Sequence, residues 1–230
     1  MLKVVNKRIL FVVAHADDET LGAGATIAKL ASQNNEIKVM SMTDGVGARG
    51  ELDNGAKDRL RAAYMASKCL GFDWISQNSF PDNQLDTVPL LEVIKLIEKI
   101  KSEFNPHIIY TNSPADLNLD HRRVSEAVLT AFRPEPKNNQ YELYTFEVPS
   151  STDYGHTSFF GSFQPNFYED IEKHWPDKIS ALKCYGKELK SPPHSRSFEG
   201  IENLARFRGT QVGLEMAEAF QLIRAINTEQ

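Results

Sequence analysis

Four residues with acid–base or metal-binding side chains lie together near the N-terminus. His15 is followed closely by three consecutive acids, Asp17, Asp18 and Glu19. Imidazole and carboxylate groups bind zinc, and a catalytic zinc site takes three such ligands and leaves one position open. Adjacent carboxylates repel one another, and a cation is the simplest group that offsets this repulsion. The cluster therefore predicts a divalent metal site.

A distant histidine can complete the ligand set. His15 and Asp18 are three residues apart, so both can face one point where a strand turns into a helix, and His121 follows another apolar segment. Asp17, between the two ligands, would be free to accept a proton from the attacking water. The competing interpretation is helix capping by the acids near each helix start, Asp120 included. Capping explains one acid, but not three acids and a histidine.

The elements that must position these residues alternate between strand and helix. Residues 9–13 are apolar and rich in β-branched side chains, as in a buried strand, and the segment from residue 20 to 30 has a helical composition. Further strands are expected at 36–42, 72–75, 107–111 and 141–148, and helices at 56–70, 90–104, 121–132, 178–189 and 198–209; residues 217–226 fit either a helix or a last strand. This order predicts the α/β class, with a Rossmann-like, doubly wound and mainly parallel sheet and helices on both faces. Residues 1–230 are expected to form one domain, whose C-terminal third is a flank or lid.

Composition excludes several classes of protein. The net charge is −5 and no basic stripe is present, which argues against a nucleic-acid partner. No segment has the length and apolar character of a membrane span or a signal peptide. Cys69 and Cys184 are expected to be reduced core thiols, which favours a cytoplasmic location. The sequence leaves open whether the protein forms a homo-oligomer.

Four ordered motifs together resemble one enzyme family. Residues 14–19 (AHADDE) resemble the Ala-His-Pro-Asp-Asp-Glu signature of the PIG-L/LmbE-like zinc-dependent N-deacetylases. Residues 43–50 are similar to the family's loop after the second strand, and residues 120–124 to its second ligand motif. Residues 205–209 and 217–220 resemble its C-terminal signature, so the resemblance covers nearly the whole chain.

The resemblance implies a role for each matching residue. Zinc (Zn2+) would be held by His15, Asp18 and His121, with Asp17 as the general base. Arg49 matches an arginine that meets the substrate or the developing oxyanion in the family; the competing interpretation is a solvated loop charge. Glu19 and Asp120 would support the ligands.

Three positions depart from the family pattern. Ala16 replaces a proline and Ala62 a common helix glutamate, and neither change removes chemistry. Asn118 stands where the family often has a histidine that stabilises the oxyanion or the leaving group. Asparagine donates a hydrogen bond but does not titrate, so the sequence does not identify the residue that acts as the general acid. Asp17, once protonated, could return the proton, and His194 is an alternative donor whose competing interpretation is a surface loop residue.

The function expected from this resemblance is the removal of an N-acetyl group from a small N-acetylated amino sugar or sugar conjugate. Two alternatives remain: a related amidase or deformylase that acts on another amide, and a non-catalytic carbohydrate-binding relative. The sequence identifies neither the acceptor sugar nor the physiological metal.

Overall fold

The computed structural model describes residues 4–45, 47, 54–135 and 141–226. In these residues, one mixed sheet contains β1 (Arg8–Val13), β2 (Glu36–Thr43), β3 (Asp73–Phe80), β4 (Ile108–Asn112), β5 (Glu142–Phe146), β6 (Phe167–Asp170) and β7 (Ala217–Arg224). The α-helices are α1 (Asp18–Ser32), α2 (Asn54–Leu70), α3 (Leu90–Phe104), α4 (Leu119–Ala131), α5 (Thr157–Phe160), α6 (Trp175–Cys184) and α7 (Phe198–Thr210). Short 3-10 turns lie at η2 (Thr152–Tyr154) and η3 (Glu172–His174).

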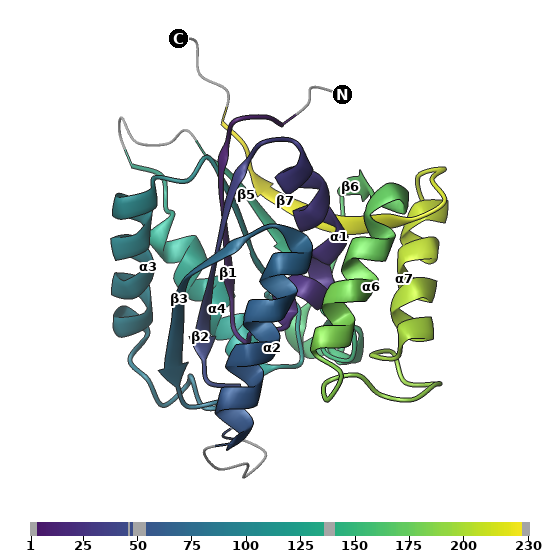
Figure 1. The fold of residues 1–230 in the computed structure, drawn as a ribbon. Helices are drawn as coiled ribbons and strands as arrows, with labels where there is room; N and C mark the ends of the chain where they lie inside the picture. Colours follow the sequence, from purple (N-terminus) through teal and green to yellow (C-terminus); the bar gives the residue numbers. More distant parts are fainter. Residues whose placement is uncertain (1–3, 46, 48–53, 136–140, 227–230) are drawn as a thin grey trace.

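The strand order is β3-β2-β1-β4-β5-β7-β6 (Figure 1). β1 to β5 are parallel, and β7 pairs antiparallel with both β5 and β6. This arrangement confirms the predicted α/β fold with a mainly parallel sheet.

Alternating side chains of β1 build two apolar layers. Ile9, Phe11 and Val13 face the layer that contains α1, α2 and α6, whereas Leu10 and Val12 face the layer that contains α3 and α4. All five side chains are fully buried, because a central parallel strand is covered on both faces. An unbroken apolar run is therefore the pattern expected of this strand.

The chain reverses its direction of travel across the sheet between β1 and β4. β2 and β3 extend the sheet on one side of β1, whereas β4 pairs with β1 on the other side. Ligands bind at such switch points, outside the carboxyl ends of the strands. Residues after β1 and after β4 therefore meet at one edge, although about a hundred positions separate them along the chain.

The C-terminal third extends the sheet. Residues 217–224 form the strand β7, which decides between the two predicted alternatives, and β6 was not predicted. α6 packs against α1 and α2 (Figure 1). Cys69 is exposed and Cys184 is half-buried, so the prediction that both thiols lie in the core was wrong. In the described residues, no helix has the length and apolarity needed to cross a membrane.

A buried ion pair holds a break in α1, the helix that begins at the predicted metal motif. Ala23 has non-helical backbone angles, with φ −141° and ψ 16°. Lys178 donates to the carbonyl of Leu21 at 2.8 Å and pairs with Glu218 at 2.6 Å. Glu218 in turn accepts from the backbone N–H groups of residues 25 and 26. The pair thus satisfies backbone groups on both sides of the break.

Candidate metal centre and active site

Three predicted ligands converge at the switch point. His15 follows β1, Asp18 begins α1, and His121 lies in the first turn of α4. Each is at least 93% buried, and their donor atoms lie within 4.8 Å of one another. The structure therefore brings together the set that the sequence predicted.

The spacing of the donor atoms fits a small tetrahedral ion. Nδ1 of His15 is 3.2 Å from Nε2 of His121, which is 3.3 Å from Oδ1 of Asp18. Nδ1 of His15 is also 3.5 Å from Oδ2 of Asp18. A tetrahedral zinc ion with bonds of about 2.0–2.1 Å would hold its ligand atoms roughly 3.3–3.4 Å apart. Two imidazoles and one carboxylate at these distances leave a fourth position open.

Carboxylates orient both imidazoles by contacting the ring nitrogen that does not face the other two residues of the triad. Nε2 of His15 lies 3.2 Å from Asp120 and 3.1 Å from Asp82, and Nδ1 of His121 lies 3.0 Å from Asp116. Such partners fix the ring orientation and the tautomer of metal-binding histidines. His15, Asp82 and Asp120 also form a second group whose donor atoms lie within 4.8 Å. Because Asp120 already accepts from the backbone N–H groups of residues 83 and 85, we assign this group an orienting role.

The electrostatics of the triad favour a cation. Burial alone would lower the pKa of His121, but Asp18 and Asp116 raise it to about 9. Burial acts in the same way on His15, whose pKa is nevertheless raised well above its ordinary value by Asp120, Asp18 and Asp82. Burial would raise the pKa of Asp18, but the two imidazoles hold it well below its usual range. The carboxylates thus hold positive charge at the position where a metal would displace protons.

Asp17 lies beside the triad and is held by two arginines. Oδ1 of Asp17 is 2.9 Å from Nη2 of Arg59 in α2, and Oδ2 is 3.6 Å from Nη1 of Arg196. Oδ2 is buried and has no hydrogen-bond partner among the described residues. The glycine at position 45 has φ +66°, and a Cβ there would lie 2.7 Å from Nε of Arg59. A larger side chain at Gly45 would therefore push against the guanidinium that holds Asp17.

Asn118 caps α4 and faces the same space. Its Oδ1 accepts from the backbone N–H groups of Asp120 and His121, at 2.8 Å and 3.3 Å. Within the described part of the chain, no group accepts a hydrogen bond from its Nδ2. One face of the amide thus supports the helix, and the N–H2 group is left to donate elsewhere.

Two predicted residues are not placed in this cluster. Arg49 lies outside the described residues. His194 does not line the cavity at the triad; its ring lies 6.4 Å from the ring of Tyr154, and its Nδ1 accepts from the backbone N–H of Arg196. The roles predicted for both residues stay predictions.

The sequence interpretation missed Asp82, Asp116, Arg59 and Arg196 as site residues. Asp82 follows β3 and Asp116 lies in the loop after β4, so both come after the carboxyl ends of strands, where a polar residue could have been suspected. Arg59 and Arg196 had no comparable signal. Arg59 is one of many charges on a helix, and Arg196 reaches the site from a loop far along the chain.

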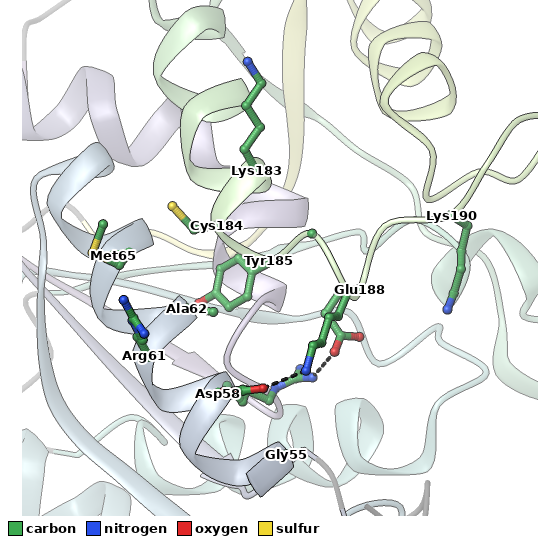
Figure 2. Close-up of a pocket in the computed structure, with 13 residues that line it drawn as sticks. Gly55, Asp58, Arg61, Ala62, Met65, Lys183, Cys184, Tyr185, Glu188 and Lys190 are labelled. Carbon is green, nitrogen blue, oxygen red and sulfur yellow. Dashed lines mark hydrogen bonds and ion pairs between the residues drawn. The ribbon is translucent and has the colours of Figure 1, made fainter.

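The triad opens into a polar cavity of about 320 Å³. Nine of its ten lining residues are polar or charged: His15, Asp17, Asp18, Arg59, Asp82, Asn83, Asn118, His121 and Arg196, with Gly45. A larger cavity of about 870 Å³ lies between α2 and the residues at and after the end of α6 (Figure 2). Glu188 pairs with Arg59 at 2.8 Å, and Lys187 pairs with Asp58 at 2.6 Å. Arg59 therefore separates the two cavities, and only the smaller one contains the metal triad.

Glu19 points away from the triad. Its Oε1 accepts from the hydroxyl groups of Thr20 and Tyr185, at 2.7 Å and 3.0 Å. The side chain is fully buried, and burial together with the nearby charge of Asp17 raises the pKa of Glu19 to about 8. The group is therefore protonated at neutral pH and supports the motif as a neutral hydrogen-bonding residue.

We expect Glu19 to make the protein less stable as the pH rises. Between pH 4.5 and about 8 the folded state keeps a proton that the unfolded state has lost, so the free energy of unfolding falls with pH. Glu19→Gln cannot ionise, so its stability relative to wild type should increase over this window, by at most about 1.4 kcal/mol per pH unit. Urea unfolding from pH 5 to 8 measures the difference. Glu103→Gln on the surface of α3 is the control. Parallel curves of unfolding free energy against pH for Glu19→Gln and wild type would contradict the conclusion that Glu19 is protonated in the folded protein.

Comparisons with known proteins found a matching family model and similar sequences. Residues 10–132 match the family model PIG-L, described as GlcNAc-PI de-N-acetylase. The chain is 31% identical over 191 residues to an uncharacterized deacetylase, YaiS, of Escherichia coli (strain K12), covering 80% of this chain and 94% of that protein. It is 25% identical to the diacetylchitobiose deacetylase of Thermococcus kodakarensis, covering 96% of this chain and 84% of that protein.

Solved structures share the fold. N,N′-diacetylchitobiose deacetylase from Pyrococcus horikoshii superposes with a TM-score of 0.75 at 23% identity, over 94% of this chain and 84% of that chain. The family model covers more than half of the chain, and the buried His–Asp triad fits a metal-dependent reaction. The protein is therefore a deacetylase of the PIG-L, or LmbE-like, family, a hydrolase that acts on amide bonds.

Proposed function

We propose that the protein uses zinc to remove an N-acetyl group from a small amino sugar or sugar conjugate. The observation that carries this proposal is the position of Asp17 beside the triad. A carboxylate oxygen without a hydrogen-bond partner lies next to two imidazoles and a carboxylate at tetrahedral spacing. This arrangement combines a metal ligand set with a carboxylate that can accept a proton, as amide hydrolysis by water requires.

The lining of the cavity supports a sugar as the substrate. Most small-molecule sites are lined mainly by apolar and aromatic side chains. This cavity instead presents charged groups and amides on almost every side, among them Asp82, Asn83 and Arg196. Sugar hydroxyl groups can replace the water that hydrates this polar lining with new hydrogen bonds, whereas an apolar substrate cannot. The names of the relatives from Thermococcus and Pyrococcus, both diacetylchitobiose deacetylases, point in the same direction.

Asp17 would carry the proton in both halves of the reaction. A zinc ion held by His15, Asp18 and His121 would polarise the amide carbonyl and lower the pKa of an attacking water. Oδ2 of Asp17 would accept the proton of that water, while Arg59 holds Oδ1 in place at 2.9 Å. The protonated carboxyl would then donate to the leaving nitrogen, which releases acetate and a free amine.

Asn118 would stabilise the charge that develops on the carbonyl oxygen. Its Nδ2 group has a proton to donate, and its Oδ1 is fixed by the start of α4. A preorganised donor of this kind contributes about 3–4 kcal/mol to the stability of the transition state. Arg49 is retained as a further candidate for the same role or for substrate contact, and His194 as a candidate proton donor. The single domain over residues 1–230 and the cytoplasmic location also remain predictions.

Amine and acetate release from a panel of substrates tests the proposal. The panel holds N-acetylglucosamine, N,N′-diacetylchitobiose, N-acetylated sugar nucleotides and sugar–thiol conjugates, with the N-formyl sugar and a simple alkyl acetamide as controls. We expect amine and acetate in equal amounts from at least one N-acetylated sugar, with zinc present and not after chelation. Release only from formyl or non-sugar amides would favour the related amidase, and no release from any substrate by the zinc-loaded protein would favour a binding role.

A further inference from the structure

Three buried charged side chains connect the metal cavity with the larger cavity. Asp17 is 2% exposed, and Arg59 and Glu188 are each 8% exposed. Nη2 of Arg59 lies 2.9 Å from Oδ1 of Asp17, and Nη1 of the same guanidinium lies 2.8 Å from Oε1 of Glu188. Arg59 therefore divides its two terminal nitrogens between two carboxylates that come from distant parts of the sequence.

This division limits how Arg59 holds Asp17. An arginine that faces one carboxylate often forms two parallel N–H···O bonds, one to each oxygen. Here Nη1 is taken by Glu188, and Nε lies beside Gly45 and has no hydrogen-bond partner among the described residues. Arg196, at 3.6 Å from Oδ2 of Asp17, is beyond hydrogen-bond distance. Oδ2 therefore keeps its capacity to accept a proton.

The turn that presents Glu188 is anchored to the helix that follows Asp17. The backbone N–H of Glu188 donates to the carbonyl of Tyr185 at 2.8 Å. The Tyr185 hydroxyl donates to Glu19 in the first turn of α1 at 3.0 Å, and both of these side chains are buried. The Glu188 carboxylate is thus held in a fixed position relative to the start of α1, where Asp17 lies.

Glu188 lies in the wall of the larger cavity and not in the wall of the metal cavity. Figure 2 shows it opposite the first turns of α2, where Arg59 and Ala62 line the same cavity. Ala62 follows Arg59 by three residues on α2 and presents only a methyl group. Residues at this spacing are neighbours on one face of a helix, so a longer side chain at position 62 can reach the same guanidinium.

We propose that Glu188 is a positioning residue for proton transfer by Asp17. Because Glu188 binds Nη1 of Arg59, the guanidinium cannot pair with both oxygens of Asp17, and one oxygen stays ready to accept the proton of the attacking water. Without Glu188, the buried guanidinium loses one of its two carboxylate partners and would turn to bind both oxygens of Asp17. This inference rests on the proposed role of Asp17 as the base and adds to it a residue from outside the metal cavity.

Removal of the Glu188 carboxylate tests the inference on the zinc-loaded protein, with the N-acetylated sugar of the substrate panel that releases the most amine. Glu188→Ala and Glu188→Met are expected to lower kcat by about tenfold to a hundredfold, the effect of a misplaced catalytic group. KM and zinc content should stay close to wild type, because Glu188 does not line the metal cavity. Glu188→Gln should keep more of the rate, since its amide oxygen still accepts from Nη1 of Arg59. Glu215→Ala, at an exposed glutamate near the start of β7, is the matched control and should behave as wild type.

Replacement of the lost carboxylate distinguishes positioning from packing. Formate fits the space that Glu188→Ala leaves and should restore most of the lost rate, whereas Glu188→Met fills that space and should not respond. Ala62→Glu in the Glu188→Ala background should also restore most of the rate, because it returns a carboxylate to the guanidinium from α2. A loss of rate that neither formate nor Ala62→Glu restores would show that Glu188 only supports the fold, and would overturn the inference.

The crystal structure of zinc-loaded Glu188→Ala and the kinetics of Asp17→Asn separate this inference from the proposed function. In Glu188→Ala, Nη1 and Nη2 of Arg59 should both lie within hydrogen-bond distance of Asp17, which is visible even if no sugar of the panel is hydrolysed. A guanidinium that keeps its single contact would overturn the inference. If Asp17→Asn is inactive and Glu188→Ala keeps the wild-type rate, Asp17 is the base and Glu188 does not position it. A wild-type rate for Asp17→Asn would contradict the proposed function, and the inference with it.

Discussion

Asp17→Asn is expected to lower kcat by roughly 10²–10⁴-fold while the protein keeps its metal. General acid–base catalysis contributes a factor of this size, and asparagine can neither accept the proton of the attacking water nor return it to the leaving nitrogen. The substitution preserves the shape of the side chain, and the ligands His15, Asp18 and His121 are unchanged. KM should therefore change little. Steady-state kinetics and zinc content per chain, measured on the same preparation, check both parts.

A control variant distinguishes the loss of the proton acceptor from a general disturbance of the site. Asp58→Asn is the matched control: Asp58 is an exposed aspartate on α2 that pairs with Lys187 and does not line the metal cavity. It should retain wild-type kcat and zinc content. A wild-type rate for Asp17→Asn would show that another group moves the proton, and a loss of zinc in this variant would place Asp17 among the ligands.

His121→Ala is expected to lose both zinc and activity. Removal of one of three protein ligands leaves one imidazole and one carboxylate, too few for a catalytic zinc site to retain its ion. The substitution also leaves Asp116 without its imidazole partner, although Ser151, Thr152 and the backbone N–H of Asn118 still donate to that carboxylate. The fold should therefore survive. Zinc content after dialysis should fall from about one ion per chain to near zero, and amine release should fall with it.

Two further variants support the interpretation of His121→Ala. Asp18→Asn replaces a different residue of the triad and should cause the same loss of zinc, while α1 still forms. His156→Ala, at an exposed histidine, should keep both metal and activity. Full zinc occupancy in His121→Ala would remove His121 from the ligand set, and a far-ultraviolet spectrum like that of wild type would confirm that the loss of metal is not a loss of fold.

The fold was largely predictable because its signals are local. The apolar run 9–13 lies in a strand covered on both faces, and the periodic pattern of 90–104 matches α3. The C-terminal third was predicted less well. β6 has only four residues, and β7 pairs with the distant strands β5 and β6, so neither has a strong pattern of its own. Cys69 illustrates the same limit: helix periodicity did not reveal which face of α2 would be covered by α6.

The sequence by itself determined the candidate metal ligands and the candidate base, because His15, Asp17 and Asp18 are grouped by their order along the chain and His121 is recognisable by its motif. Only the tertiary structure decided what surrounds them. Arg59 reaches Asp17 from α2, Arg196 from the loop before α7, and Asp116 holds both His121 and the loop that carries Tyr154. The physical reason is that hydrogen bonds and ion pairs act over about 3 Å, whatever the separation along the chain. A helix arginine has the same sequence context whether it faces solvent or a buried carboxylate, and only the packing of α2 against α1 and α6 distinguishes the two.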